Sequence, residues 1–287
     1  MFSDTHFHFS KMCALAETDG TEILSAMAKR DCFCALDIGT ESGDLTTRKK
    51  TLDKALSRVS AELQDGARRM LHYTAGVWPS PDAITHRKEA VEALEKDIVS
   101  FPEKIAAIGE CGIDRHWNAA GDGSSESDFG GTLRDGECEL FEMQIALAKK
   151  LNVPVVVHSR DAFEDTYRCI KNSGCDRGII HCFSYGIEEA RAFLDCGWHI
   201  SFSGSVTYAK KSKADDMRKL LSYVPSDRIL IETDSPYLAP VPCRGKTNTP
   251  LLVEHVYRYA ALARNVSPEA LSETVDENCR RLFETER

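Results

Sequence analysis

The feature that most constrains the fold of this chain is a regular alternation of short apolar runs with longer amphipathic segments, from one end to the other. An apolar run of about four to eight residues between polar boundaries is typical of a strand buried on both faces. We expect eight such strands. They lie at Met1–Thr5, Cys32–Ile38, Leu71–Val77, Ile105–Gly109, Pro154–Val157, Gly178–Ile180, His199–Phe202 and Arg228–Ile231.

The segments between these runs carry apolar residues at helical spacing. In Glu137–Leu151, for example, Phe141, Ile145 and Ala148 share one face of a helix. The tail Pro250–Phe283 would add an eighth barrel helix and one more. The other predicted helices are Thr21–Arg30, Leu45–Gln64, Arg87–Ser100, Ala162–Asn172, Ile187–Cys196 and Ala214–Tyr223.

Eight buried strands alternating with helices predict an α/β fold, the closed (β/α)8 TIM barrel, which needs about 250 residues. An open doubly wound sheet is the alternative, but the glycine-rich nucleotide fingerprint is missing after the first strand. We therefore expect residues 1–287 to form a single TIM-barrel domain. One segment, Arg115–Gly136, is predicted to be a long loop, either a lid over the site or a surface insertion.

Composition limits the kinds of binding partner and the cellular compartment that we expect for this protein. The net charge of −9 argues against broad coating of nucleic acid, but it is compatible with bound cations that engage a phosphate. No transmembrane run or signal peptide is visible, so we expect a cytoplasmic protein, with the nucleus as a second option and no membrane partner. The eleven cysteines include no CxxC pair, which is typical of reduced, buried thiols. No protein partner can be read from the sequence.

Metal-binding side chains gather where the predicted strands end. Asp4, His6 and His8 project together from the first strand, because alternate side chains of a strand share a face. The other strand ends carry Glu110, His158, His181, Glu232 and Asp234. Any one of these histidines would more often be structural. Active sites of barrels are built at the carboxyl ends of the strands, so the coincidence at five ends predicts a metal centre.

The number of ligands predicts two ions. Four histidines and two carboxylates are too many for one catalytic zinc, which takes about three protein ligands and a water. Two ions about 3.5–4 Å apart could share a hydroxide that attacks the substrate. We place His6, His8 and Asp234 on the first ion, His158 and His181 on the second, and Glu110 between the two.

The acidic residues of the site are given separate catalytic roles. Asp234, which would touch the bridging water, is the candidate general base. Glu232 lies two residues earlier on the same face and could support the site, act as an alternative base or bind a third ion. Asp4 is expected to orient a histidine ring and not to bind metal itself. The sequence leaves the metal open among Mg²⁺, Mn²⁺, Zn²⁺ and Ni²⁺.

Six blocks of the chain contain these residues and the sequence around them. They are Ser3-Asp4-Thr5-His6-Phe7-His8, Ile108-Gly109-Glu110-Cys111-Gly112-Ile113-Asp114, Val157-His158-Ser159-Arg160-Asp161-Ala162, His181-Cys182-Phe183-Ser184, Ile200-Ser201-Phe202-Ser203-Gly204 and Glu232-Thr233-Asp234-Ser235-Pro236-Tyr237-Leu238-Ala239-Pro240. In order and over almost the whole chain, they resemble the signature blocks of the TatD family of metal-dependent deoxyribonucleases.

The resemblance implies a TIM-barrel hydrolase of ester bonds that cleaves DNA, typically as a 3′→5′ exonuclease acting on single strands or 3′ ends. It also implies substrate contacts by Arg160, Tyr237, Arg244 and Asn248. The chain departs from the family pattern in two places. The block after the third strand usually reads G-x-H-P-H, but here Trp78 and Ser80 replace both histidines, and the Arg115–Gly136 segment is longer.

Two other functions are compatible with parts of the pattern. Amidohydrolase-type barrels share the histidines and the aspartate and cleave small cyclic amides, esters or lactones. Many of them carry a modified lysine where this chain has Glu110, which favours the nuclease. A metal-stabilised scaffold without chemistry would not need both candidate bases together with six metal ligands.

Overall fold

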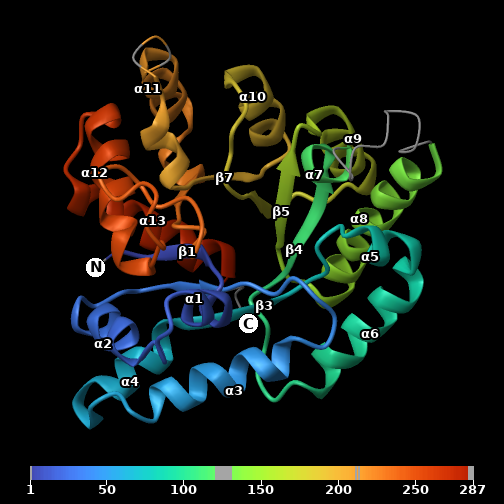
Figure 1. The fold of residues 1–287 in the computed structure, drawn as a ribbon. Coiled ribbons are helices and arrows are strands. Elements are labelled where there is room, and N and C mark those ends of the chain that lie inside the picture. Colours follow the sequence, from blue (N-terminus) through green and yellow to red (C-terminus); the bar gives the residue numbers. More distant parts are fainter. Residues whose placement is uncertain (1, 120–130, 211, 213, 284–287) are drawn as a thin grey trace. The chain divides into compact units, whose positions relative to one another are not determined.

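The computed structural model describes residues 2–119, 131–210, 212 and 214–283, and Figure 1 shows its elements. Its strands are β1 (Asp4–Phe7), β2 (Ala35–Asp37), β3 (Leu71–Ala75), β4 (Ala107–Asp114), β5 (Val155–Arg160), β6 (Gly178–Ile180), β7 (His199–Phe202) and β8 (Ile229–Ile231). They follow one another in a single sheet in the order β1 to β8. Parallel strands in sequential order, with helices between them, are the topology of a TIM barrel, and the predicted fold class is confirmed.

Helices occupy most of the connections. They are α1 (Phe9–Leu15), α2 (Thr21–Lys29), α3 (Leu45–Leu56), α4 (Ala61–Met70), α5 (Pro81–Thr85), α6 (Arg87–Ser100), α7 (Arg115–Ala119), α8 (Gly131–Leu151), α9 (Phe163–Ser173), α10 (Ile187–Asp195), α11 (Ala214–Tyr223), α12 (Val253–Arg264) and α13 (Pro268–Phe283). Short 3₁₀ turns lie at Gly204–Tyr208, Ser226–Arg228 and Pro250–Leu252. No helix among the described residues is both long and apolar enough to cross a lipid bilayer.

The chain divides into two units. The first comprises Met1–Ile38, Thr47–His72 and Ile200–Arg287, and the second comprises Gly39–Thr46 and Tyr73–His199. In the first unit β1 pairs with β2, β7 pairs with β8, and Phe7 forms a parallel bridge with Ser235. In the second unit β4 pairs with β3 and β5, and β5 pairs with β6. Parallel strand pairs are thus found within each unit, and the single domain stays a prediction.

The strands are buried on both faces. Val155, Val156 and Val157 of β5 are inaccessible to solvent in the second unit, as are Ile229 and Ile231 of β8 in the first. A strand that is covered on both sides needs apolar residues at consecutive positions, not at alternating ones. This burial explains why the strands are visible in the sequence as continuous apolar runs.

The predicted helix Leu45–Gln64 is wrong, because two helices, α3 and α4, occupy this region. Between them, Val59 is buried and Ser60 has extended backbone angles (φ −57°, ψ 144°) as it begins α4. The backbone leaves the helical conformation before Ser60, and serine is a favoured residue at the start of the next helix. The short helices α1, α5 and α7 were not predicted, since one or two turns carry too little periodicity.

The fourth strand runs further than predicted, past Gly109 to Asp114. Gly109 and Gly112 have φ values of +148° and +142°, and a Cβ on Gly112 would lie 2.0 Å from the carbonyl oxygen of His158. Both glycines thus permit close approach of β5 and do not end the strand. In the segment Arg115–Gly136, α7 forms the start and α8 begins at Gly131, whereas residues 120–130 lie outside the described part of the chain.

Candidate metal centre

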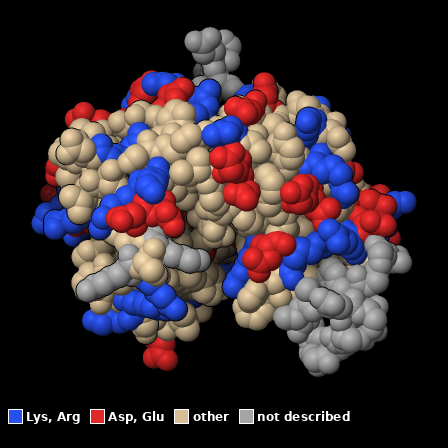
Figure 2. Space-filling view, turned by 90° about the horizontal axis from the view of Figure 1, so that it is seen from above, with Lys and Arg blue, Asp and Glu red and all other residues tan. Residues whose placement is uncertain are grey.

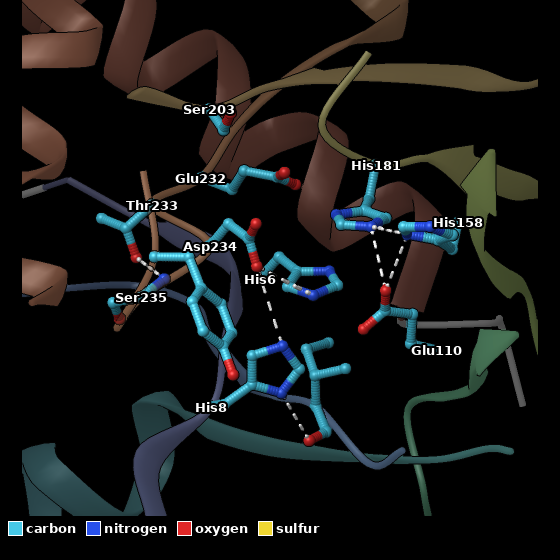
Figure 3. A network of polar contacts seen from close by, with 12 residues as sticks. His6, His8, Glu110, His158, His181, Ser203, Glu232, Thr233, Asp234 and Ser235 are labelled. Carbon is cyan, nitrogen blue, oxygen red and sulfur yellow. Dashed lines mark hydrogen bonds and ion pairs between the residues drawn. The ribbon is translucent and has the colours of Figure 1, made fainter. Parts of the chain in front are cut away.

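The first cluster of candidate ligands lies in the first unit, at the ends of β1 and β8. The Nε2 atoms of His6 and His8 each lie 3.7 Å from Oδ1 of Asp234. Their imidazole centroids are 5.1 Å apart, and Figure 3 shows the three side chains turned toward one another. Imidazole nitrogens and carboxylate oxygens are the types of donor that bind divalent cations in proteins.

Backbone contacts fix the geometry of this first cluster. The Nδ1 of His8 donates to the carbonyl oxygen of Ile38 at 3.3 Å, which leaves Nε2 to face Asp234. The backbone N–H of Asp234 donates to the carbonyl oxygen of His6 at 2.8 Å, and that of His8 donates to Ser235 at 2.8 Å. Asp234 has a left-handed φ of +56°, a conformation that costs energy and is concentrated at functional sites.

Asp4 does not have the role that the sequence predicted. Its buried carboxylate accepts hydrogen bonds from the backbone N–H of His6 (3.2 Å), and from the N–H (2.9 Å) and Oγ1 (2.6 Å) of Thr233. Burial raises the pKa of Asp4 to about 8, against the opposing effect of the Thr233 hydrogen bonds. The expectation that Asp4 orients a histidine ring is wrong, because the carboxylate binds backbone groups at the adjacent strand end. It holds the Thr233 turn against β1.

Glu232, the alternative base, is fully buried. Its Oε2 accepts a hydrogen bond of 2.6 Å from Ser201 of β7, and its backbone N–H donates to the carbonyl oxygen of Phe202. In turn, the hydroxyl of Ser201 lies 3.2 Å from that of Thr5 in β1. Hydroxyl groups from two strands thus hold Glu232 in place beside the first cluster.

The second cluster lies in the second unit and combines Glu110 of β4, His158 of β5 and His181, which follows β6. Oε1 of Glu110 lies 3.0 Å from Nδ1 of His158 and 3.2 Å from Nε2 of His181. The two imidazole nitrogens are 3.3 Å apart (Figure 3), and the candidate ligand atoms of all three residues lie within 4.8 Å of one another. This cluster has the same donor chemistry as the first.

Asp114 is the site residue that sequence reasoning missed. Its Oδ2 lies 2.7 Å from Nε2 of His158, and its Oδ1 accepts the backbone N–H groups of His116 (2.9 Å) and Trp117 (2.7 Å). Because Nε2 of His158 faces Asp114, Nδ1 is the ring nitrogen that faces Glu110. Asp114 belongs to a motif recognised in the sequence, but the strand was predicted to end at Gly109, so no role was given to it.

The pKa values of this pair shift as expected for a charged hydrogen bond. Burial favours the neutral form of Asp114, yet its hydrogen bonds with His158 and the Trp117 N–H hold the pKa of the carboxyl below its usual range. Burial also works against a charged His158. Hydrogen bonds to Asp114 and Glu110 outweigh it and raise the pKa of the imidazole.

A second buried carboxylate supports Asp114 from α8. Glu137 is inaccessible to solvent, and its Oε1 accepts the backbone N–H of Asp114 and Nδ2 of Asn118, both at 2.8 Å. Its Oε2 pairs with the guanidinium of Arg115. The same Nδ2 of Asn118 also donates to the carbonyl oxygen of Pro79 at 2.8 Å. The end of β4, the helix α7 and the loop after β3 are therefore joined by one polar network.

Trp78 lies at the place where the family pattern has a histidine. Its ring centroid is 5.8 Å from that of His158, and the two rings meet edge to face. An indole cannot act as a base or bind a metal ion. At this position the chain provides an aromatic contact for a ligand histidine, not a further titrating group.

The predicted substrate residues differ in exposure. Arg160 is half-buried, with its guanidinium carbon 5.7 Å from the ring centroid of Trp117. Tyr237 is 49% exposed and meets His8 edge to face at 6.1 Å, and the exposed Arg244 lies 4.4 Å above the ring of Tyr208.

Asn248 is fully buried, unlike the other predicted substrate residues. Its Nδ2 donates to the carbonyl oxygens of Thr233 (2.9 Å) and Tyr237 (2.6 Å). Asn248 thus holds the loop that follows β8, and its contact with a substrate stays a prediction.

Charges of both signs are interspersed on the surface. Figure 2 shows Lys and Arg side chains alternating with Asp and Glu over the described part of the visible face. This pattern agrees with the net charge of −9. It differs from the continuous basic band that binding along a nucleic-acid backbone would need.

Comparisons with known proteins agree with this geometry. A family model described as TatD related DNase matches residues 3–284. YcfH of Escherichia coli K12, named an uncharacterized metal-dependent hydrolase, is 33% identical over 285 residues, which cover 98% of this chain and 94% of YcfH. A Rahnella protein named 3′-5′ ssDNA/RNA exonuclease TatD is 33% identical over 216 residues, covering 73% of this chain and 76% of that protein.

Solved structures support the same fold. YJJV, a TatD homolog from E. coli K12, superposes with a TM-score of 0.78 at 22% identity, covering 99% of this chain and 98% of that one. A TatD-family hydrolase from Entamoeba histolytica superposes with a TM-score of 0.72 at 19% identity, covering 93% and 90%.

Proposed function

Because the chain belongs to the TatD-related DNase family and is a metal-dependent hydrolase, we propose that it cleaves phosphodiester bonds in DNA as a 3′→5′ exonuclease. The finer part of the proposal, exonuclease action on single strands, is supported by the name of the Rahnella relative. The observation that carries the proposal is the pair of ligand clusters, each with two imidazoles and a carboxylate at strand ends.

We propose that each cluster holds one divalent ion. His6, His8 and Asp234 would hold the first, and His158 and His181 the second. Glu110 is proposed to contact both, because the carboxyl ends of all strands meet at one end of a TIM barrel. Glu232 could add a third ion. Two ions, when bound, lower the pKa of water and neutralise charge on the phosphate.

The protein's own groups are proposed to move the proton and hold the substrate. The Asp234 side chain is 13% exposed, more than those of His6 and His8, so its carboxylate can accept a proton from an attacking water. Arg160 or Arg244 would hold a non-bridging oxygen of the reacting phosphate, or the next phosphate along the strand. The half-exposed ring of Tyr237 would contact the sugar or the base beside the first cluster.

The test uses metal-stripped protein and single-stranded DNA labelled at its 5′ end, with Mg²⁺, Mn²⁺, Zn²⁺ or Ni²⁺ added in turn. We expect a ladder that shortens from the 3′ end, is abolished by EDTA, and is absent with Glu110→Ala. Glu164→Ala, which removes an exposed glutamate of α9, is the matched control and should cleave normally. Hydrolysis of dihydropyrimidine-type amides without any cleavage of DNA would overturn the proposal in favour of an amidohydrolase.

A further inference from the structure

Trp117 is a large aromatic side chain left in solvent beside the second cluster. It is 61% exposed on α7, directly after β4. Leaving an indole in water forgoes the stabilisation that its burial would provide, so an exposed tryptophan beside a candidate site is expected to contact a ligand.

One carboxylate connects Trp117 to the second cluster. Oδ1 of Asp114 accepts the backbone N–H of Trp117 at 2.7 Å, and Oδ2 lies 2.7 Å from Nε2 of His158. Asp114 therefore links the backbone of Trp117 to His158, a candidate metal ligand. This spacing suits a subsite for a neighbouring part of the substrate, not for the reacting phosphate itself.

A cation lies against the same indole. Arg160 follows His158 by two positions in β5, so both side chains project on the same side of the strand. The guanidinium carbon of Arg160 lies 5.7 Å from the ring centroid of Trp117, within the range of a cation–π contact. A planar aromatic surface with a guanidinium beside it matches the chemistry of a nucleotide, which joins a flat base to an anionic phosphate.

The polar network beneath α7 holds this arrangement in place before any substrate binds. Asn118, next to Trp117, donates to both Pro79 and Glu137 at 2.8 Å, and it is 4% exposed. Glu137 also pairs with Arg115 at the first position of α7. Both sides of Trp117 are thus anchored to buried groups, as a binding subsite requires.

We propose that Trp117 and Arg160 form a nucleotide subsite, in which the indole stacks on an unpaired base and the guanidinium binds the adjoining phosphate. This inference rests on the proposed function. Stacking tolerates every base, since each has a π face, but it requires that the base be unpaired. The subsite therefore accounts for a preference for single-stranded ends and predicts no strict sequence specificity.

The experiment measures kcat and KM on an intact single-stranded oligonucleotide and on three variants of it. Each variant carries a single abasic residue, at the last, the second-last or the third-last 3′ position. It compares the wild type with Trp117→Ala, Trp117→Phe and the control Tyr223→Ala, which removes an exposed aromatic ring of α11. We expect Trp117→Ala to raise KM for intact DNA about tenfold or more, with little change in kcat. Trp117→Phe and Tyr223→Ala should stay near the wild type.

Coupling to one base is the decisive result. If Trp117 stacks on a base, one abasic position raises KM in the wild type by a similar factor but adds nothing in Trp117→Ala. Equal abasic penalties in both proteins, or an unchanged KM in Trp117→Ala, would overturn the subsite while wild-type cleavage still supports the proposed function. If the wild type cleaves no oligonucleotide with any of the four metals, the proposed function and this inference both fail.

Discussion

Replacement of Asp114 by asparagine tests the reasoning about the second cluster most directly. In the wild type, Oδ2 accepts from Nε2–H of His158, so the Nδ1 lone pair is available to a metal ion. Oδ1 already accepts two backbone N–H groups, those of His116 and Trp117. In Asp114→Asn, the amide oxygen must keep that position, and the amide NH₂ then faces His158.

The consequence is a reversed tautomer. An NH₂ group beside Nε2 makes this nitrogen an acceptor and moves the imidazole proton to Nδ1, where it blocks coordination. Turning the amide round instead would sacrifice the two backbone hydrogen bonds at Oδ1, worth about 0.5–1.5 kcal/mol each. Either way the free energy of metal binding falls by about 1–3 kcal/mol, which corresponds to a loss of affinity of roughly 5- to 150-fold.

The assay is competition between the metal-stripped protein and a chromophoric chelator for Zn²⁺ or Mn²⁺, with circular dichroism to confirm the fold. Asp161→Asn is the control, because it removes the same charge from an exposed residue whose carboxylate contacts His116, at 3.3 Å, and not His158. Wild-type metal affinity in Asp114→Asn, or an equal loss in Asp161→Asn, would refute the tautomer argument.

Three further changes test the packing and the charges of the second unit. Gly112→Ala would place a Cβ 2.0 Å from the carbonyl oxygen of His158, so urea denaturation should show a loss of about 2 kcal/mol or more; an unchanged midpoint would contradict the need for glycine there. Glu137→Ala removes one of the two carboxylates that pair with Arg115 and leaves the buried N–H of Asp114 without its acceptor, so it should cost about 1–3 kcal/mol in the same assay, more than Glu137→Gln. A hydrogen bond with Cys169, and nearby arginines, lower the pKa of Cys138 to about 7, so thiolate absorbance at 240 nm should rise as the pH passes about 7 and this step should be absent from Cys138→Ser.

Much of the architecture could be predicted because it depends on local patterns. Strands buried on both faces require consecutive apolar residues, so runs such as Val155–Val157 and Ile229–Ile231 are visible without knowledge of their neighbours. Candidate ligands that directly follow such runs are found from the same pattern: His181 comes after β6, and His158 lies near the end of β5. Once a barrel is inferred, those ends must share one face.

Contacts between distant segments could not be predicted in this way. Asp4 binds Thr233, which lies 229 positions further along the chain. No local pattern reveals this contact, so the expected contact of Asp4 with a histidine ring was wrong. Gly109 looks like the end of a strand, but it is a point at which β5 approaches β4, as Gly112 is too. That approach carries β4 on to Asp114, whose place beside His158 depends on the pairing of the two strands.

The sequence by itself thus determined the order of the strands and the donor set for metal ions, because both are written in residue types at short spacing. Only the tertiary structure decided which nitrogen of His158 faces the cluster, what Asp4 and Asn248 hold in place, and where Trp117 lies. The physical reason is that hydrogen-bond direction and side-chain exposure are set by neighbours in space, and those neighbours come from parts of the chain that are far apart in sequence.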